Sequence, residues 1–228
     1  MSVISTDPSK FELDSKFCEF VGAVIGDGNI YKKDRKYNRK YLIGITGDKT
    51  LDAAYFDYLS NVIFGFLGRR PRIKVRRNGG LYLKIQSKPL VNFIVNEIGI
   101  PVGEGKCYNV HVPKSFIGWN RTRYMIRCVM DTDGSVFVSD KPGSPGYPSL
   151  EITTTSSLLA MGIFEILSKR KFRVRLRSFV DKRYGTRTFK VSLNGWNMLE
   201  KWYNEIGFSN PEKLKKAVSI INKRNGGT

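Results

Sequence analysis

The sequence predicts an α+β protein built from two pseudo-symmetric repeats, each with the element order αββαββα. Three short stretches of the first half recur in the second half, in the same order and at nearly the same displacement. Some apolar segments show no alternation of apolar and polar residues, which indicates helices. Between them lie short segments in which apolar and polar residues alternate, which indicates paired strands. The period is too long for a solenoid, so two lobes with similar folds are expected.

The internal repeat rests on three pairs of matching segments. They are 27–31 (DGNIY) with 133–137 (DGSVF), 43–46 (IGIT) with 150–153 (LEIT), and 96–99 (NEIG) with 204–207 (NEIG). Such matches are typical of a tandem duplication with small insertions. They assign residues 1–105 to the first repeat, 106–119 to a linker and 120–228 to the second repeat.

Each expected element has a counterpart in the other repeat. Helices are expected at 15–25, 51–67 and 89–98, and again at 122–130, 157–168 and 195–206. Strands are expected at 29–33, 41–46, 135–139 and 149–153, with second hairpins at 71–86 and 172–193. Asp14 and Asn120 are the expected N-caps of the two opening helices, and 139–148 reads as a hairpin loop.

The charge points to a polyanionic partner. The chain has 39 Lys and Arg against 20 Asp and Glu, a net charge of +19. Nucleic acid is the first expectation and an anionic membrane surface the second. Residues 1–114 carry +8 and residues 115–228 carry +11, so both halves are expected to meet the same polyanion.

Several protein classes are excluded by the composition. Three scattered cysteines form no disulfide framework, which favours a reducing compartment. The single histidine, His111, excludes a Cys2His2 zinc finger and any mechanism with two imidazoles. The apolar stretch at 17–25 is too short to span a bilayer, and the N-terminus lacks a signal-peptide core. A soluble intracellular protein is expected, cytoplasmic, nucleoid-associated or organellar, with no membrane partner.

Basic and apolar residues alternate strictly at 72–76 (RIKVR) and at 173–177 (RVRLR). A strand places such alternate residues on opposite faces, so each repeat should carry a curved antiparallel sheet with one basic face. Lys and Arg suit phosphates, while Arg and Gln suit base edges. The residues assigned to this nucleic-acid-binding face are Tyr31, Lys33, Arg35, Arg39, Arg70, Arg72, Lys74, Arg76, Tyr82, Lys84, Gln86, Arg173, Arg175, Arg177, Lys182, Arg183, Arg187 and Lys190.

One aspartate ends each opening helix. Asp27 and Asp133 are each followed by a glycine that suits a left-handed C-terminal turn. The negative end of the helix dipole disfavours an acid there by about 0.3–1 kcal/mol. An acid in this disfavoured place, in both repeats, indicates a function beyond that of a turn.

Small residues spaced by four allow the two opening helices to pack closely. Gly22 and Gly26 form such a stripe in the first helix, and Cys128 and Thr132 occupy the same positions in the second. This packing would bring the two aspartates together, where carboxylates about 4 Å apart repel by about 4 kcal/mol at an effective dielectric of 20. A divalent cation with oxygen ligands offsets that repulsion, and Mg²⁺ is the first candidate.

The segments 20–28 (FVGAVIGDG) and 126–134 (IRCVMDTDG) resemble the LAGLIDADG motif of homing endonucleases. The resemblance extends from about Ser15 to Lys216. It implies a monomeric two-repeat enzyme whose two sheets form a saddle in the DNA major groove. It also implies divalent-metal-dependent cleavage of both strands at a long asymmetric site, leaving 3′ overhangs.

The resemblance further implies roles for individual residues. Asp27 and Asp133 match the metal-binding acids, and Gly26 and Thr132 complete the predicted site for two or three Mg²⁺ ions. Ca²⁺ is expected to support DNA binding without cleavage. The family often places a lysine near each scissile phosphate, and the candidates are Lys106 and Lys213.

The chain departs from the family pattern at four positions. Gly47 and Thr154 stand where relatives often have a glutamine that orders the active-site water, and Asp48 or Thr155 could substitute. Asp131 adds an acid expected to point away from the helix interface. Arg127 replaces a small apolar residue of the motif.

Three functions follow from these observations. A site-specific double-strand DNA endonuclease, expected to be encoded in an intron, is the leading one. An RNA-binding splicing maturase that assists an intron RNA is the first alternative, and a DNA-binding regulator without catalysis is the second. Only a nuclease needs both acids, and both are present.

Overall fold

The computed structural model describes residues 11–77, 79–116, 118–141, 144–180, 182 and 185–225. The first repeat consists of α1 (Ser15–Ile25), β1 (Gly28–Arg35), β2 (Asn38–Asp48), α2 (Ala53–Leu67), β3 (Arg72–Val75), β4 (Gly80–Gln86), α3 (Lys88–Asn92) and the π-helical η2 (Phe93–Glu97). The second consists of α5 (Trp119–Asp133), β5 (Gly134–Lys141), β6 (Ser144–Thr154), α6 (Ser157–Lys169), β7 (Val174–Val180), β8 (Arg187–Asn194), α7 (Trp196–Glu205) and α8 (Pro211–Asn225). A short helix, α4 (Lys106–Asn109), lies between the repeats.

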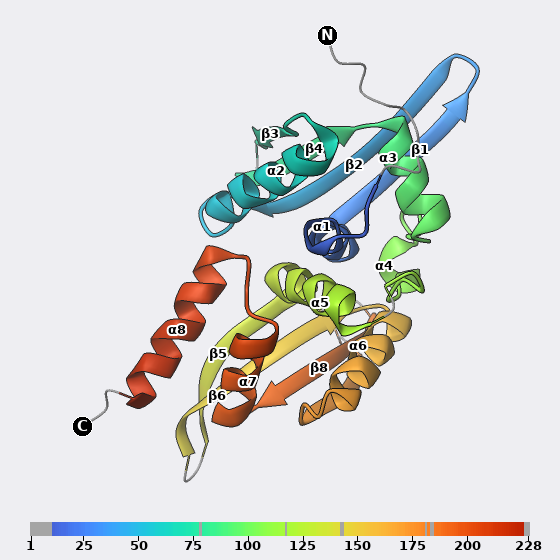
Figure 1. Ribbon diagram of the computed structural model, residues 1–228. Helices are drawn as coiled ribbons and strands as arrows, with labels where there is room; N and C mark the ends of the chain where they lie inside the picture. The colour runs from blue at the N-terminus through green and yellow to red at the C-terminus, as the bar shows by residue number, and fades with distance from the viewer. Residues whose placement is uncertain are drawn as a thin grey trace.

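The two sheets have the same topology, which confirms the α+β fold with two pseudo-symmetric repeats. Their strand orders are β1-β2-β4-β3 and β5-β6-β8-β7, and all neighbouring strands are antiparallel. Helices α2 and α3 cover one face of the first sheet, and α6 and α7 cover the corresponding face of the second (Figure 1). In the part of the chain that the structure describes, no helix covers the other face of either sheet, here called the open face.

Helices α1 and α5 pack against each other at the centre of the molecule, between the two sheets (Figure 1). A Cβ at Gly22 would overlap the Met125 carbonyl oxygen and lie 2.9 Å from the Cβ of Cys128. A Cβ at Gly26 would overlap the hydroxyl of Thr132. The stripes of small residues therefore allow the close approach that the sequence predicted.

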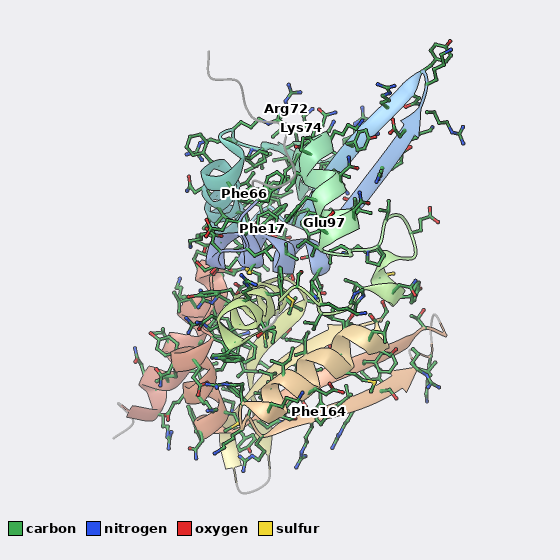
Figure 2. The ribbon with its side chains drawn as sticks, turned by 45° about the vertical axis from the view of Figure 1, so that its right-hand side comes forward. Phe17, Phe66, Arg72, Lys74, Glu97 and Phe164 are labelled. Atoms are coloured by element: carbon green, nitrogen blue, oxygen red, sulfur yellow. The ribbon has the colours of Figure 1, made fainter. Side chains whose placement is uncertain are left out.

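One hydrophobic core extends through both repeats. Its buried members come from α1 and α5, from the helix-covered faces of both sheets and from the helices that cover them. In the first repeat, Phe17 of α1 packs edge-on against Phe66 of α2, with ring centroids 5.1 Å apart (Figure 2). Among the described residues, no helix combines the length and apolar character that crossing a membrane requires.

The predicted start of α1 is confirmed, whereas the predicted start of α5 is wrong. Asp14 accepts a hydrogen bond from the Phe17 amide at 2.7 Å and so caps α1. Helix α5 begins at Trp119, after Gly118, whose φ of 92° ends the preceding loop. Asn120 lies inside the first turn instead, because the Thr122 amide already donates the first helical hydrogen bond to the Gly118 carbonyl, at 3.2 Å.

Three further expectations differ from the structure. Strands β5 and β6 continue into the segment 139–148, so the expected loop is mostly strand. Gly134 has φ −99°, and Gly28 is also outside the left-handed region, so neither makes a left-handed turn. A Cβ at either would overlap the preceding helix, at Val24 or Met130, because the strand turns back directly over it. Helix α8 was not expected.

Candidate active site

The paired helices bring the two motif aspartates to one end of their interface. Asp27 follows Gly26, the C-cap residue of α1, and Asp133 is the last residue of α5. A Cβ built on Gly26, the neighbour of Asp27, would lie 3.3 Å from the Asp133 carboxylate. Both aspartates are half-buried. The structure therefore places two acids from different repeats side by side at the centre of the molecule.

The surroundings of both carboxylates favour the protonated form. Burial raises the pKa of Asp133 to about 7, and repulsion from Asp27 adds to the effect. Burial also raises the pKa of Asp27, and the negative charge of Asp52 raises it further. In the described part of the chain, neither Asp27 nor Asp133 forms an ion pair within 4.0 Å, and no carboxylate oxygen of either residue accepts a hydrogen bond. A cation beside them would relieve this unfavourable charge.

Lys106 lies at the C-terminal end of α1. Its side chain is only 6% exposed, and its ammonium donates hydrogen bonds to the carbonyl oxygens of Gly26, at 3.1 Å, and Gly28. Burial lowers the pKa of Lys106 to about 8, while the charges of Asp133 and Asp27 act in the opposite direction. Lys106 therefore places a positive charge next to the acid pair and neutralises the carbonyl end of α1.

Lys213 occupies the matching place at the end of α5. Its ammonium lies 2.7 Å from the carbonyl oxygens of Met130, Asp131 and Gly134, and 3.3 Å from that of Thr132. Burial lowers its pKa, and the nearest charges that oppose this effect are those of Asp131 and Asp52. The structure thus brings both candidate lysines to the acid pair, one at each motif helix.

The donor atoms at this site fit Mg²⁺. No cluster of three or more His, Cys, Asp or Glu side chains is present in the described ranges. Mg²⁺ is usually held by one or two carboxylates, with waters and substrate phosphates completing its coordination, so two aspartates suffice. The carbonyls of Gly26 and Thr132, the other predicted ligands, already accept hydrogen bonds from Lys106 and Lys213.

The positions that depart from the family pattern have other partners. Asp48 accepts hydrogen bonds from the amides of Thr50 and Leu51, at 2.7 and 2.9 Å. Thr155 donates to the Cys107 carbonyl at 2.8 Å. Both candidate substitutes for the missing glutamine therefore have local roles, although a cavity of about 230 Å³ opens between Asp133 and the threonines around Thr155.

Most of the predicted nucleic-acid-binding side chains lie on the open faces. The strand registers place Tyr31 opposite Leu42, Arg72 opposite Lys84, Lys74 opposite Tyr82, and Arg177 opposite Lys190. Arg72 and Lys74 lie on β3, at the outer edge of the first sheet (Figure 2). The same registers place most of the predicted residues on the two open faces. On the first sheet they are Tyr31, Lys33, Arg35, Arg72, Lys74, Tyr82, Lys84 and Gln86, with Arg76 at a strand end, and on the second they are Arg175, Arg177 and Lys190, with Arg173 at a strand end.

Part of this charge is already compensated. Lys190 pairs with Glu151, an acid of the same open face, at 2.7 Å. The Arg76 guanidinium stacks over the Tyr82 ring at 4.3 Å. Arg72 and Lys74 of β3 and Arg175 and Arg177 of β7 form no ion pair among the described residues, so their charge stays available on the two faces.

Three predicted face residues lie elsewhere. Arg39 pairs with Asp34 at 3.5 Å, and its register places it on the helix-covered side. Arg70 donates to the Ser60 hydroxyl at 3.3 Å, so it turns towards α2. Arg187 is in register with Val180, on the side opposite to Lys190. Lys182 lies in an exposed turn, and Arg183 lies outside the described residues.

Two residues near the acid pair were not identified from the sequence. Asp52 lies close enough to Asp27 and Lys213 to influence the pKa of both. Asn210 bonds to Asp52 and caps α8. A signal for α8 was present, because Asn210-Pro211-Glu212 combines a favoured N-cap residue with proline at the first helical position.

No family model matches the sequence. Two curated relatives are replication factor C small subunits, from Methanocaldococcus jannaschii (26% identical over 214 residues, 94% of this chain and 10% of that protein) and Thermococcus kodakarensis (24% identical over 212 residues, 93% and 22%). The chain thus spans between about a tenth and a fifth of the length of these relatives.

Solved structures of endonucleases share the fold over nearly the whole chain. They include the meganuclease I-SmaMI bound to DNA (TM-score 0.60, 12% identity, 96% of this chain and 91% of that one) and the homing endonuclease I-DmoI with DNA and Ca (TM-score 0.59, 18% identity, 93% and 100%). A third is the LAGLIDADG meganuclease I-AabMI (TM-score 0.55, 11% identity, 92% of each chain). The chain has the two-repeat LAGLIDADG fold, which confirms the resemblance found from the motifs.

Proposed function

We propose that this protein is a site-specific endonuclease that cuts both strands of DNA with the help of divalent metal ions. The observation that carries the proposal is the pair of half-buried aspartates, Asp27 and Asp133, which come from different repeats and, within the described ranges, have no cationic partner in ion-pair contact. A scaffold without catalysis gains nothing from holding two acids together in this way. The DNA-bound endonucleases that share the fold support the same reading.

Each group of the site has a role in phosphodiester hydrolysis. Asp27 and Asp133 hold divalent cations, with Mg²⁺ the expected ion. A bound divalent ion supplies Lewis-acid stabilisation of charge on the attacking and leaving oxygens. Lys106 and Lys213 add fixed positive charge beside the phosphates, and their hydrogen bonds to the ends of α1 and α5 keep that charge in place.

The open faces provide DNA binding. Arg and Lys side chains on β3 and β7 contact phosphates, and Gln86 and Arg175 are placed to reach base edges. Because the two sheets differ in sequence, the preferred site is asymmetric. A monomer suffices, since one chain carries both repeats and both acids.

The intact acid pair favours a nuclease over the two alternatives. A maturase or a regulator would use the same basic faces on RNA or DNA without needing Asp27 and Asp133. The similarity to replication factor C small subunits covers a limited part of those proteins, so it adds no competing activity to the proposal. Encoding by an intron remains part of the proposal.

The test is cleavage of a DNA substrate in which the sequence upstream of this protein's gene is joined directly to the sequence downstream of it. Purified full-length protein with Mg²⁺ should linearise a supercoiled plasmid that carries this joined sequence, and EDTA should stop the reaction. Asp27→Asn and Asp133→Asn should each abolish cleavage, since each removes one carboxylate charge from the site. DNA binding in Ca²⁺ should stay within a few-fold of that of the wild type.

Two outcomes would contradict the proposal. An Asp27→Asn protein that cuts at the wild-type rate would refute the role of the acid pair. A wild-type protein that nicks neither strand, but accelerates splicing of the intron RNA with or without Asp27, would establish the maturase function instead.

A further inference from the structure

The side chain of Asn210 is only 2% exposed, and it forms both a helix cap and a hydrogen bond between the repeats. Its Oδ1 accepts hydrogen bonds from the amides of Glu212, at 3.0 Å, and Lys213, at 3.5 Å, and thereby caps helix α8. Its Nδ2 donates to Oδ1 of Asp52 at 3.1 Å. Asn210 belongs to the second repeat and Asp52 to the first, so this hydrogen bond crosses between the repeats.

Asp52 is itself held firmly. It directly precedes α2, and its other carboxylate oxygen accepts a hydrogen bond from the Asp48 amide at 2.8 Å. Its charge acts on Asp27 of the first repeat and on Lys213 of the second. The bond between Asp52 and Asn210 therefore lies next to the acid pair, on the side of Lys213.

The segment before α8 is fixed by two more acids. The Ser209 amide donates to Oδ2 of Asp131 at 2.8 Å, and the Ser209 hydroxyl donates to Glu19 at 3.3 Å. Glu19 and Asp131 are each 1% exposed. Residues 209 and 210 are thus bound to acids of α1 and α5 and to the residue before α2. Lys213 follows Asn210 by less than one helical turn. The cap therefore fixes the backbone position from which the Lys213 side chain extends to the end of α5.

The other lysine is attached differently, since the carbonyl of Cys107, the next residue, accepts a hydrogen bond from Thr155 of the second repeat at 2.8 Å. Lys106 begins α4 after Gly105, which has no side chain to form a cap or a bond between the repeats. Its ammonium bonds to α1, the motif helix of its own repeat. The two halves of the site therefore differ, although their acids and lysines correspond.

We propose that Asn210 and Asp52 form an inter-repeat latch that positions Lys213 at the end of α5, so that one half of the active site is complete only when the first repeat is docked. Asn210 and Asp52 are positioning residues, since neither is placed at the reacting phosphate. The proposal rests on the nuclease function proposed above. It adds that disruption of the latch slows cleavage of one DNA strand more than the other.

Exchange of the donor and the acceptor tests the latch. Asn210→Asp keeps the cap, since aspartate and asparagine cap helices equally well, but it sets a carboxylate against Asp52. Asp52→Asn in the same chain restores a donor and an acceptor with the positions reversed. Asn210→Ser is the milder variant, because it keeps a cap and removes the donor without adding charge. Asn222→Asp, on the exposed side of α8 and about 18 Å further along it, is the control for the added charge.

The readout is the single-turnover cleavage rate of each strand, measured with Mg²⁺ on doubly labelled duplex. Asn210→Asp should slow one strand by about 10- to 100-fold, the cost expected for a misplaced group, and leave the other closer to the wild type. Asn210→Ser should slow the same strand less. The double exchange should recover most of the lost rate, and the Asn222→Asp protein should match the wild type.

Three outcomes would overturn the latch. Asn210→Asp could slow the cleavage of both strands equally, or it could leave both rates unchanged. The double exchange could also give a folded protein whose cleavage rate is not restored. Circular dichroism establishes which variants are folded. A wild-type protein that cuts no DNA would overturn the nuclease function, and the latch with it. A wild-type protein that cuts normally, together with unaffected variants, would overturn the latch alone.

Discussion

Gly22 leaves little room for adjustment at the α1–α5 interface, because a Cβ there would overlap the backbone carbonyl oxygen of Met125 rather than only a movable side chain. Gly22→Ala should therefore destabilise the protein by about 1–3 kcal/mol, as overpacking of a core does. For a chain of this size the melting temperature should fall by about 2–4 °C per kcal/mol. Thermal unfolding followed by circular dichroism measures the change.

Gly65 of α2 is the matched control. It lies on the exposed side of a helix, and a Cβ there would have no neighbour within 4 Å. Gly65→Ala should raise stability by up to about 1 kcal/mol, the difference in helix propensity between the two residues. A Gly22→Ala protein as stable as the Gly65→Ala protein would show that the helices are not in close contact at Gly22.

The three cysteines should differ sharply in reactivity. Cys107 is exposed, whereas Cys18 and Cys128 are buried. Burial raises the pKa of Cys18 to about 12 and that of Cys128 well above its usual range, so neither forms the reactive thiolate near neutral pH. Iodoacetamide should add one label to the folded protein and three to the unfolded protein, by intact mass. Cys107→Ser should abolish labelling of the folded form.

At the scale of elements, a buried ion pair joins the two motif helices. Glu19 of α1 is 1% exposed and pairs with Arg127 of α5 at 2.9 Å. The hydroxyl of Tyr58 on α2 also donates to Glu19, and Arg127 also donates to the Ile206 carbonyl. Arg127, a departure from the motif, is thus the partner that allows an acid to be buried in α1.

Removal of Arg127 should be much more costly than removal of the whole pair. Arg127→Met leaves the buried Glu19 with only the exposed Lys16, at 3.7 Å, as a cationic partner, and loss of one member of a buried pair typically costs about 3–5 kcal/mol. Glu19→Met combined with Arg127→Met should recover most of this loss. Urea unfolding gives the free energies. As a control, Arg39→Met breaks the exposed pair with Asp34 and should cost less than about 1 kcal/mol.

Periodicity and duplication were enough to predict most of the elements. Residues 15–25 have the same bounds in the structure, because both Asp14 and the apolar run are local signals. Sequence alone could not place Arg39, Arg70 and Arg187. Their positions depend on strand register and on contacts with α2, which join residues that are distant in the sequence. Asn210 was missed because its second partner, Asp52, is 158 positions away.

For the molecule as a whole, the spread of basic residues predicts a steep salt dependence of DNA binding. The logarithm of the binding constant should fall by about 0.9 per phosphate contact for each decade of salt. Arg175→Ala with Arg177→Ala should reduce this slope by about 1.8, because both side chains lie on the open face. Fluorescence anisotropy over a range of KCl concentrations measures the slope.

Lys169 and Lys171 provide the control for this measurement. Both are exposed and lie at or just beyond the end of α6, which covers the other face of the second sheet. Their replacement by alanine removes the same charge but should leave the slope unchanged. Equal losses for the two double variants would mean that binding depends on total charge rather than on the open face.

The contacts of the two glycines also bear on how the duplicated halves could have evolved. Gly22 and Gly26 of the first repeat have no side chain, and the side chains of Cys128 and Thr132 of the second repeat pack against them. If two copies of the first half paired through this helix, the facing glycines would leave gaps in the interface. If two copies of the second half paired, the facing Cys128 and Thr132 side chains would overlap. The two halves are therefore complementary at this interface, and neither half alone should form a close-packed symmetric dimer with a second copy of itself.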